Sequence, residues 1–182
     1  MAKYIINDLR ETLHYLPYGL ILGVLVMLVL NFVNSMREQK GKRTIPMLSY
    51  GAFFTYVAII LCITFLSRES GSRDGIDLDL FSTWGNNPRN HAYVVENVLL
   101  FIPLGFVCPW TFKVLRNFFV CTLLGAAAST AIECLQLLTK RGFFQIDDIL
   151  TNTLGMAIGC ILFWIFKGLG RLLGFGRTKE VS

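Results

Sequence analysis

Long stretches without a charged residue alternate with short charged connections along this chain of 182 residues. None of its 17 basic or 12 acidic residues falls inside five of these stretches. The stretches are Thr12–Met36, Thr44–Ser67, Asn97–Phe112, Asn117–Ile132 and Ile149–Phe166. A helix of a soluble domain carries charges along its exposed face, so this pattern is typical of helices surrounded by lipid. It predicts an all-α, polytopic transmembrane bundle and excludes a soluble enzyme or a nucleic-acid-binding module.

The number of spans follows from their length, because a bilayer core about 30 Å thick needs about 20 apolar residues per helix. We predict five spans, Leu16–Met36, Ile45–Leu66, Tyr93–Phe112, Asn117–Leu138 and Ile149–Phe166. Pro103 interrupts the third and should bend it near Ile102, since proline removes a backbone donor. Mean hydropathy of +0.56 agrees with a membrane protein. The five cysteines lie in or beside apolar stretches, which indicates buried packing thiols and no disulfide or metal site.

Lysine and arginine are concentrated in alternate connections, which predicts the orientation of the chain. Ten of the 17 basic residues follow the first, third and fifth spans. They are Arg37, Lys40, Lys42, Arg43, Lys113, Arg116, Lys167, Arg171, Arg177 and Lys179. Because cytoplasmic connections are enriched in these residues, we predict the N-terminus outside and the C-terminus inside. We divide the chain into a two-helix segment with the start of an outer loop (1–75), a three-span core (76–166) and a basic cytoplasmic tail (167–182).

The longest hydrophilic connection is the predicted outer loop, Arg68–Ala92. Within it, Ile76–Trp84 alternates apolar and acidic residues, as a strand does, and ends in aromatic residues. With no partner strand in the sequence pattern, we interpret it as a strip lying in the outer membrane interface. Small residues four positions apart, such as Gly155 and Gly159, predict close packing of helices within the bundle.

Polar side chains inside the last three spans are the main candidates for function, because an ionisable residue in a span costs about 2.5–3.5 kcal/mol. Glu133 is the clearest case and shares one helix face with Gln136. With the predicted topology, these two lie in the outer half of the fourth span, at the level of Asn97 in the third span and of Asp148 and Asn152 in the fifth. We therefore predict a polar cluster near the outer leaflet.

We expect the Glu133 carboxylate to have a salt-bridge or hydrogen-bond partner, because an isolated carboxylate at this depth is too costly. We predict that it reaches Arg141, Asn97 or Asn152, in a cavity that opens toward the outer leaflet and is bordered by Phe101, Phe143 or Phe144. Structural interpretations stay open beside this one. Asp148 can cap the fifth helix, and Glu133 with Arg141 can form a structural ion pair.

Two ordered motifs resemble signatures of the VanZ-like family. The first is Glu96-Asn97-x3-Phe101-x-Pro103-Leu104-Gly105-Phe106. The second is Ile132-Glu133-x2-Gln136, followed by Arg141 and by Asp147-Asp148-x3-Asn152-x2-Gly155-x3-Gly159. The resemblance covers about residues 76–166. It implies an integral protein of the bacterial plasma membrane, whose prototype confers low-level resistance to the glycopeptide teicoplanin, and it implies no catalytic residue.

Three functional hypotheses remain. The first is a cell-envelope protein that modulates glycopeptide resistance through a polar pocket for a lipid head group, a lipid-linked wall precursor or a lipoglycopeptide. The predicted binding residues are Asn97, Glu133, Gln136, Arg141, Asp148 and Asn152. The others are an intramembrane enzyme acting on a lipid-linked substrate, for which no catalytic motif is present, and a structural subunit whose polar residues only tie helices together. We expect no cofactor, metal or nucleic acid.

Overall fold

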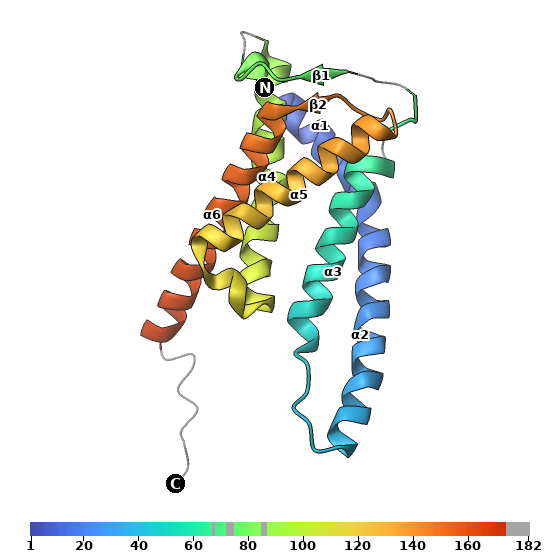
Figure 1. Ribbon diagram of the computed structural model, residues 1–182, viewed down its shortest axis with the longest axis vertical. Helices are drawn as coiled ribbons and strands as arrows, with labels where there is room; N and C mark the ends of the chain where they lie inside the picture. Colours follow the sequence, from blue (N-terminus) through green and yellow to red (C-terminus); the bar gives the residue numbers. More distant parts are fainter. Residues whose placement is uncertain (67, 72–74, 85–86, 174–182) are drawn as a thin grey trace.

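Five long apolar helices form the body of the protein (Figure 1). The computed structural model describes residues 1–66, 68–71, 75–84 and 87–173. The long helices are α2 (Leu16–Gln39), α3 (Met47–Leu61), α4 (Pro88–Thr111), α5 (Phe118–Leu138) and α6 (Ile146–Leu172). Helix α3 continues into a π-helical segment, η2 (Cys62–Leu66). Each of the five is long and apolar enough to cross a membrane, which confirms the predicted number of spans.

Shorter elements join the long helices. They are α1 (Ala2–Thr12), the 3-10 turns η1 (Leu13–Tyr15), η3 (Ser82–Trp84) and η4 (Lys113–Arg116), and the strands β1 (Ile76–Asp77) and β2 (Phe144–Gln145). We expected no partner strand for the outer loop. This expectation was wrong, because β1 pairs in parallel with β2. Two residues are too few to give a recognisable strand pattern at 144–145. Helix α1 was also not foreseen, because its polar residues keep it outside every charge-free stretch.

Helices α4 and α6 make the most extensive contact in the fold, and glycines allow it. A Cβ atom on Gly105 would collide with the backbone carbonyl of Met156, and one on Gly159 with that of Ile102. Helix α4 stays helical through Pro103. The small residues predicted to pack helices closely therefore bring two backbones into direct contact along this pair.

Helices α2 and α3 form a separate hairpin that also packs through glycines (Figure 1). A Cβ on Gly23 would meet the Thr55 side chain, and one on Gly51 would come 2.7 Å from Cγ of Met27. The neighbours here are mainly side chains, which can move more easily than a backbone. The hairpin contacts the other three long helices mainly where α3 packs against α4.

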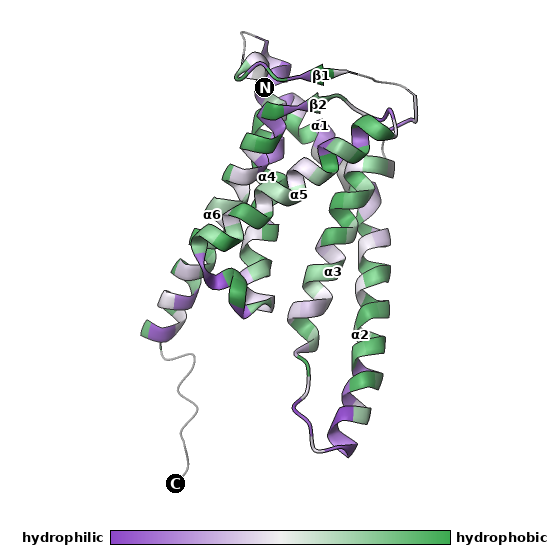
Figure 2. Cartoon of the chain, in the orientation of Figure 1, coloured by the Kyte–Doolittle hydropathy of each residue, from purple (hydrophilic) through white to green (hydrophobic). Residues whose placement is uncertain are grey.

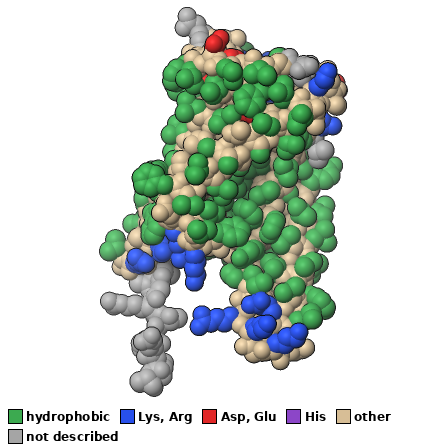
Figure 3. All heavy atoms as spheres, in the orientation of Figure 1, with side chains coloured by type: hydrophobic (Ala, Val, Ile, Leu, Met, Phe, Trp, Pro, Cys, Tyr) green, Lys and Arg blue, Asp and Glu red, His purple; other side chains and the backbone are tan. Residues whose placement is uncertain are grey.

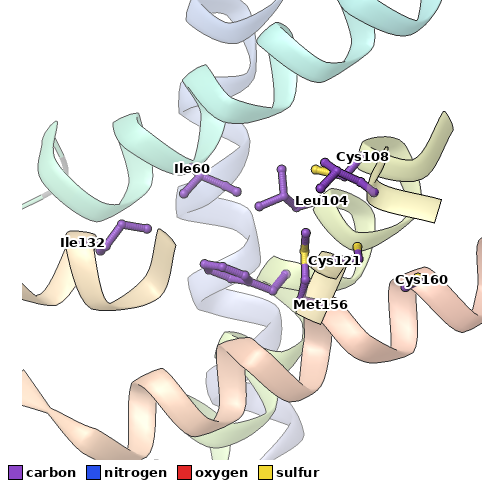
Figure 4. Packing of buried hydrophobic residues seen from close by; sticks show 9 residues of the cluster. Ile60, Leu104, Cys108, Cys121, Ile132, Met156 and Cys160 are labelled. Atoms are coloured by element: carbon purple, nitrogen blue, oxygen red, sulfur yellow. The ribbon is translucent and has the colours of Figure 1, made fainter. Parts of the chain in front are cut away.

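The apolar core lies between α3, α4, α5 and α6 (Figure 4). Phe101, Met156 and Cys160 are fully buried there. Four of the five cysteines are buried free thiols, as predicted, whereas Cys134 is exposed on α5. The expectation that all five pack inside was therefore wrong for Cys134, which faces away from the bundle.

Polar residues gather at both ends of the bundle, with hydrophobic side chains over the middle (Figures 2 and 3). One end, here called the basic end, holds the α2–α3 turn, η4 and the end of α6. Its charged residues are Arg37, Glu38, Lys40, Lys42, Arg43, Lys113, Arg116, Lys167 and Arg171. The opposite end carries α1, β1, β2 and η3, and the candidate site lies there.

Candidate functional site

A cavity of about 1320 Å³, here called the polar chamber, lies at the end of the bundle opposite the basic end. Every helix from α1 to α6 contributes to its wall. Its polar lining comprises Asp8, Arg10, His14, Tyr15, Tyr56, Thr64, Arg68, Asp77, Ser82, Asn90, Tyr93, Glu96, Asn97, Glu133, Gln136, Gln145, Asp148 and Asn152. Its apolar lining comprises Ile6, Leu13, Leu16, Ile59, Ile63, Leu99, Leu100, Ile132 and Phe143. Such a lining suits a ligand with both polar and apolar parts.

Glu133 lies on α5 with only 2% of its surface exposed. Its Oε2 accepts a hydrogen bond of 3.0 Å from the backbone N–H of Gln145, the residue that precedes α6. Helix N-termini leave N–H groups without partners, and a carboxylate also complements the helix dipole there. Glu133 therefore joins the end of α5 to the start of α6 while it faces the chamber.

Asp148 lies in the first turn of α6 and also lines the chamber. It interacts with the side chain of Asn97 on α4. The Arg68 guanidinium acts electrostatically on both Asp148 and Glu133. A Cβ on Gly142 would come 2.7 Å from Nη1 of Arg68, so the glycine leaves the space that this guanidinium occupies. Carboxylates from two helices thus share one arginine.

Gln136 and Asn152 are the remaining predicted binding residues in the chamber, and their side chains also join neighbouring helical segments. The side-chain amide of Gln136 donates to the backbone carbonyl of Thr64 in η2, at 3.3 Å. The amide of Asn152 donates to the hydroxyl of Ser129 at 2.9 Å, which links α6 to α5. Both amides are almost fully buried. The structure therefore brings five of the six predicted binding residues to one chamber, namely Asn97, Glu133, Gln136, Asp148 and Asn152.

Arg141 does not line the chamber. Its Nη1 donates to the backbone carbonyls of Phe65, at 2.6 Å, and Arg68, at 3.2 Å. The expected pairing of Glu133 with Arg141, Asn97 or Asn152 was wrong, since Glu133 bonds to Gln145 instead. The physical reason is that the last turn of a helix exposes carbonyl groups without helical partners, and the guanidinium satisfies those at the end of η2.

Two further hydrogen bonds join the same two connections. The backbone N–H of Gly71 donates to the carbonyl of Lys140 at 2.9 Å, and the Ser70 hydroxyl donates to the carbonyl of Thr139 at 3.1 Å. With Arg141, they fasten the segment that follows α3 to the segment that follows α5. We call this set of contacts the clasp, and its effect is to hold Arg68 at the chamber wall.

The loop that contains β1 and η3 is held by buried and exposed carboxylates. Asp147, which is 2% exposed, accepts a 2.7 Å hydrogen bond from the backbone N–H of Phe81. Phe81 has a φ of 66°, a conformation that is uncommon for a residue with a side chain. Asp77 accepts a hydrogen bond from the Ser82 hydroxyl at 2.8 Å. Asp147 therefore positions the loop that supplies Asp77 and Ser82 to the chamber wall.

Several chamber residues were not singled out from the sequence. Arg68 was counted only as a loop charge, although it is the first charged residue after a long apolar stretch. Asp8 and Arg10 lie on α1. Of the three aromatic residues expected at the rim, Phe143 lines the chamber, Phe101 is buried in the core and Phe144 belongs to β2.

The chemistry available in the chamber is ionic and hydrogen-bonding. Its carboxylates and amides can bind cations and donors, and its guanidinium groups can bind anions. Among the residues that the structure describes, no group of three or more histidines, cysteines and acidic residues could hold a metal ion.

The VanZ/LLP1 family matches residues 53–167, more than half of the chain and all of its chamber-forming residues on α4, α5 and α6. The chain therefore belongs to this family. Searches of curated proteins and of solved structures found no match.

Proposed function

We propose that this VanZ/LLP1 family protein lowers the action of a glycopeptide such as teicoplanin at the outer face of a bacterial plasma membrane. In this proposal the N-terminus lies outside and the C-terminus inside, so that the chamber opens to the outer leaflet. Residues Asn97, Glu133, Gln136, Asp148 and Asn152 bind the head group of a membrane lipid, a lipid-linked wall precursor or a lipoglycopeptide. Arg141 serves the site indirectly, through the clasp.

The observation that carries the proposal is the contrast between the ends of the bundle. Buried polar residues of α5 and α6 and half-buried polar residues of α4 line one cavity at one end, while basic residues occupy the connections at the other. Cytoplasmic connections are rich in lysine and arginine, which supports placing the chamber outside. Polar groups at that depth cost free energy to bury, so their concentration at one site favours a functional role.

The apolar lining favours an amphiphilic ligand. Ile59 and Ile63 from the α3 side and Leu99 from α4 lie in the same cavity as the carboxylates. A membrane lipid or a lipoglycopeptide, with its polar head and its acyl chain, offers both surfaces at once. Binding would hold the lipid or the lipoglycopeptide in the chamber, away from the wall precursors of the outer leaflet.

The direct test is expression in a glycopeptide-sensitive Gram-positive host that lacks a related protein. We expect the teicoplanin concentration that stops growth to rise several-fold over the empty vector, with the protein quantified in the membrane fraction. An unchanged threshold at full membrane expression would contradict the proposal.

A second candidate is an intramembrane enzyme, which the placement of two carboxylates favours. Glu133 and Asp148 lie close enough to interact electrostatically, and their hydrogen-bond partners differ. Two carboxylates in different surroundings can divide the roles of acid and base. Turnover of radiolabelled envelope lipids by the purified protein, abolished by Glu133→Gln, would favour this candidate over binding alone.

A further inference from the structure

The balance of charges in the chamber indicates what kind of head group it accepts. Five carboxylates line it, against two guanidinium groups. The carboxylates are Asp8, Asp77, Glu96, Glu133 and Asp148, and the guanidinium groups are Arg10 and Arg68. Asp8 and Glu96 hydrogen-bond to each other and so share a proton, which leaves the chamber a formal excess of two negative charges. A cavity of one sign, with apolar walls, concentrates ligands of the opposite sign.

Hydrogen-bond acceptors are also in excess. Asn152 is 4% exposed and lines the chamber, yet its Oδ1 has no donor among the residues that the structure describes. Its amide nitrogen is already used, because it donates to Ser129. A buried oxygen of Glu96, Oε1, likewise has no donor within the described part of the chain. Buried polar atoms of folded proteins nearly always have partners, so two acceptors in one cavity indicate a ligand that donates.

The excess of carboxylates and the unpaired oxygen of Asn152 indicate the same chemistry. We infer that the chamber recognises a primary ammonium group carried by an amphiphile, with the carboxylates and the Asn152 carbonyl around the ammonium and the apolar wall along the chain. An ammonium group offers three donors and no acceptor, which fits a wall with surplus acceptors. Hydrogen bonds between charged groups are also stronger than neutral ones. The inference rests on the proposed role of the chamber as a binding site.

The arrangement of the acidic residues favours ammonium over a metal ion. Asp8 on α1 and Glu96 on α4 interact with each other, whereas Glu133 and Asp148 lie beside Arg68. No group of three or more histidines, cysteines and acidic residues that could hold a metal ion is present among the described residues. Carboxylates spread over a chamber of about 1320 Å³ suit an organic cation better than a compact ion.

The test measures saturable binding of radiolabelled decylamine to the purified protein in detergent micelles. Unlabelled decylamine, decanoate and decanol compete for the site, because they share a chain length and differ only in the charge of the head. We expect decylamine to compete at least about tenfold better than either of the others. Equal or better competition by decanoate, or displacement of the label by millimolar Ca²⁺, would overturn the inference.

Variants connect the selectivity to named residues. We expect Glu96→Gln and Asn152→Ala each to weaken decylamine binding about tenfold while decanol binding stays unchanged. Glu96 is only partly buried, so Glu96→Gln should fold even where a core variant does not. Glu38→Gln, at an exposed position on the basic end, is the matched control and should bind normally. Unchanged selectivity in both chamber variants would contradict the assignment.

Two further competitors identify the source of the amine. Phosphatidylethanolamine in the micelles would displace the label if the ligand is a lipid head group, and a soluble lysine peptide would displace it if the ligand is a peptide amine. Displacement by phosphatidylethanolamine supports the inference, whereas displacement by the lysine peptide alone would overturn the requirement for an amphiphile. Decylamine binding is measured on purified protein and does not depend on the resistance phenotype. An unchanged teicoplanin threshold would therefore refute the resistance proposal, whereas ammonium recognition is decided by the competition experiment alone.

Discussion

The two ends of the bundle use the same residue types in different ways. At the basic end, Arg37 donates to the carbonyl of Arg43, six residues away in the same exposed turn. At the chamber end, Arg141 donates to the carbonyls of Phe65 and Arg68, 76 and 73 residues away. An exposed local contact stabilises one turn, whereas a partly buried contact between distant segments stabilises the arrangement of helices. Burial and sequence separation therefore distinguish the arginine contacts at the two ends.

The largest expected effect on stability is that of Arg141→Ala. It removes two charge-assisted hydrogen bonds of the clasp, so we expect the free energy of unfolding to fall by about 2 kcal/mol. The same change at Arg37 should cost about 0.5 kcal/mol, because its contact is exposed. Unfolding by sodium dodecyl sulfate in mixed micelles, followed by circular dichroism, measures both. Equal losses would refute the contrast between the ends.

A somewhat smaller loss is expected at a buried amide of the basic end. The side chain of Asn34 is 7% exposed and exchanges two hydrogen bonds with the backbone of Ile45, at 2.9 and 2.8 Å. We expect Asn34→Ala to lower the free energy of unfolding by about 1.5 kcal/mol. Decylamine binding by the folded fraction should stay unchanged, because the residue lies far from the chamber. Lost selectivity in this variant would show that the chamber depends on the whole bundle.

The sequence allowed prediction of the features that depend on long patterns. Charge-free stretches indicated the five spans, and the level of Glu133, Asp148 and Asn97 in their helices indicated one shared site. The features that depend on short contacts were missed. Two-residue strands have no periodicity, and Arg141 bonds to carbonyl groups of a segment 76 and 73 residues away, which no local pattern indicates. Arg68 lies in the chamber because the clasp holds its segment there, and this depends on residues more than 60 positions away.

The most direct test of a functional chamber is the teicoplanin threshold of two matched variants in the same host, at equal membrane levels. Glu133→Gln replaces a buried carboxyl group at the chamber, and Glu38→Gln replaces an exposed one at the basic end. We predict that Glu133→Gln lowers the threshold to that of the empty vector, while Glu38→Gln keeps the full rise. A folded Glu133→Gln protein that retains the full rise would contradict the account.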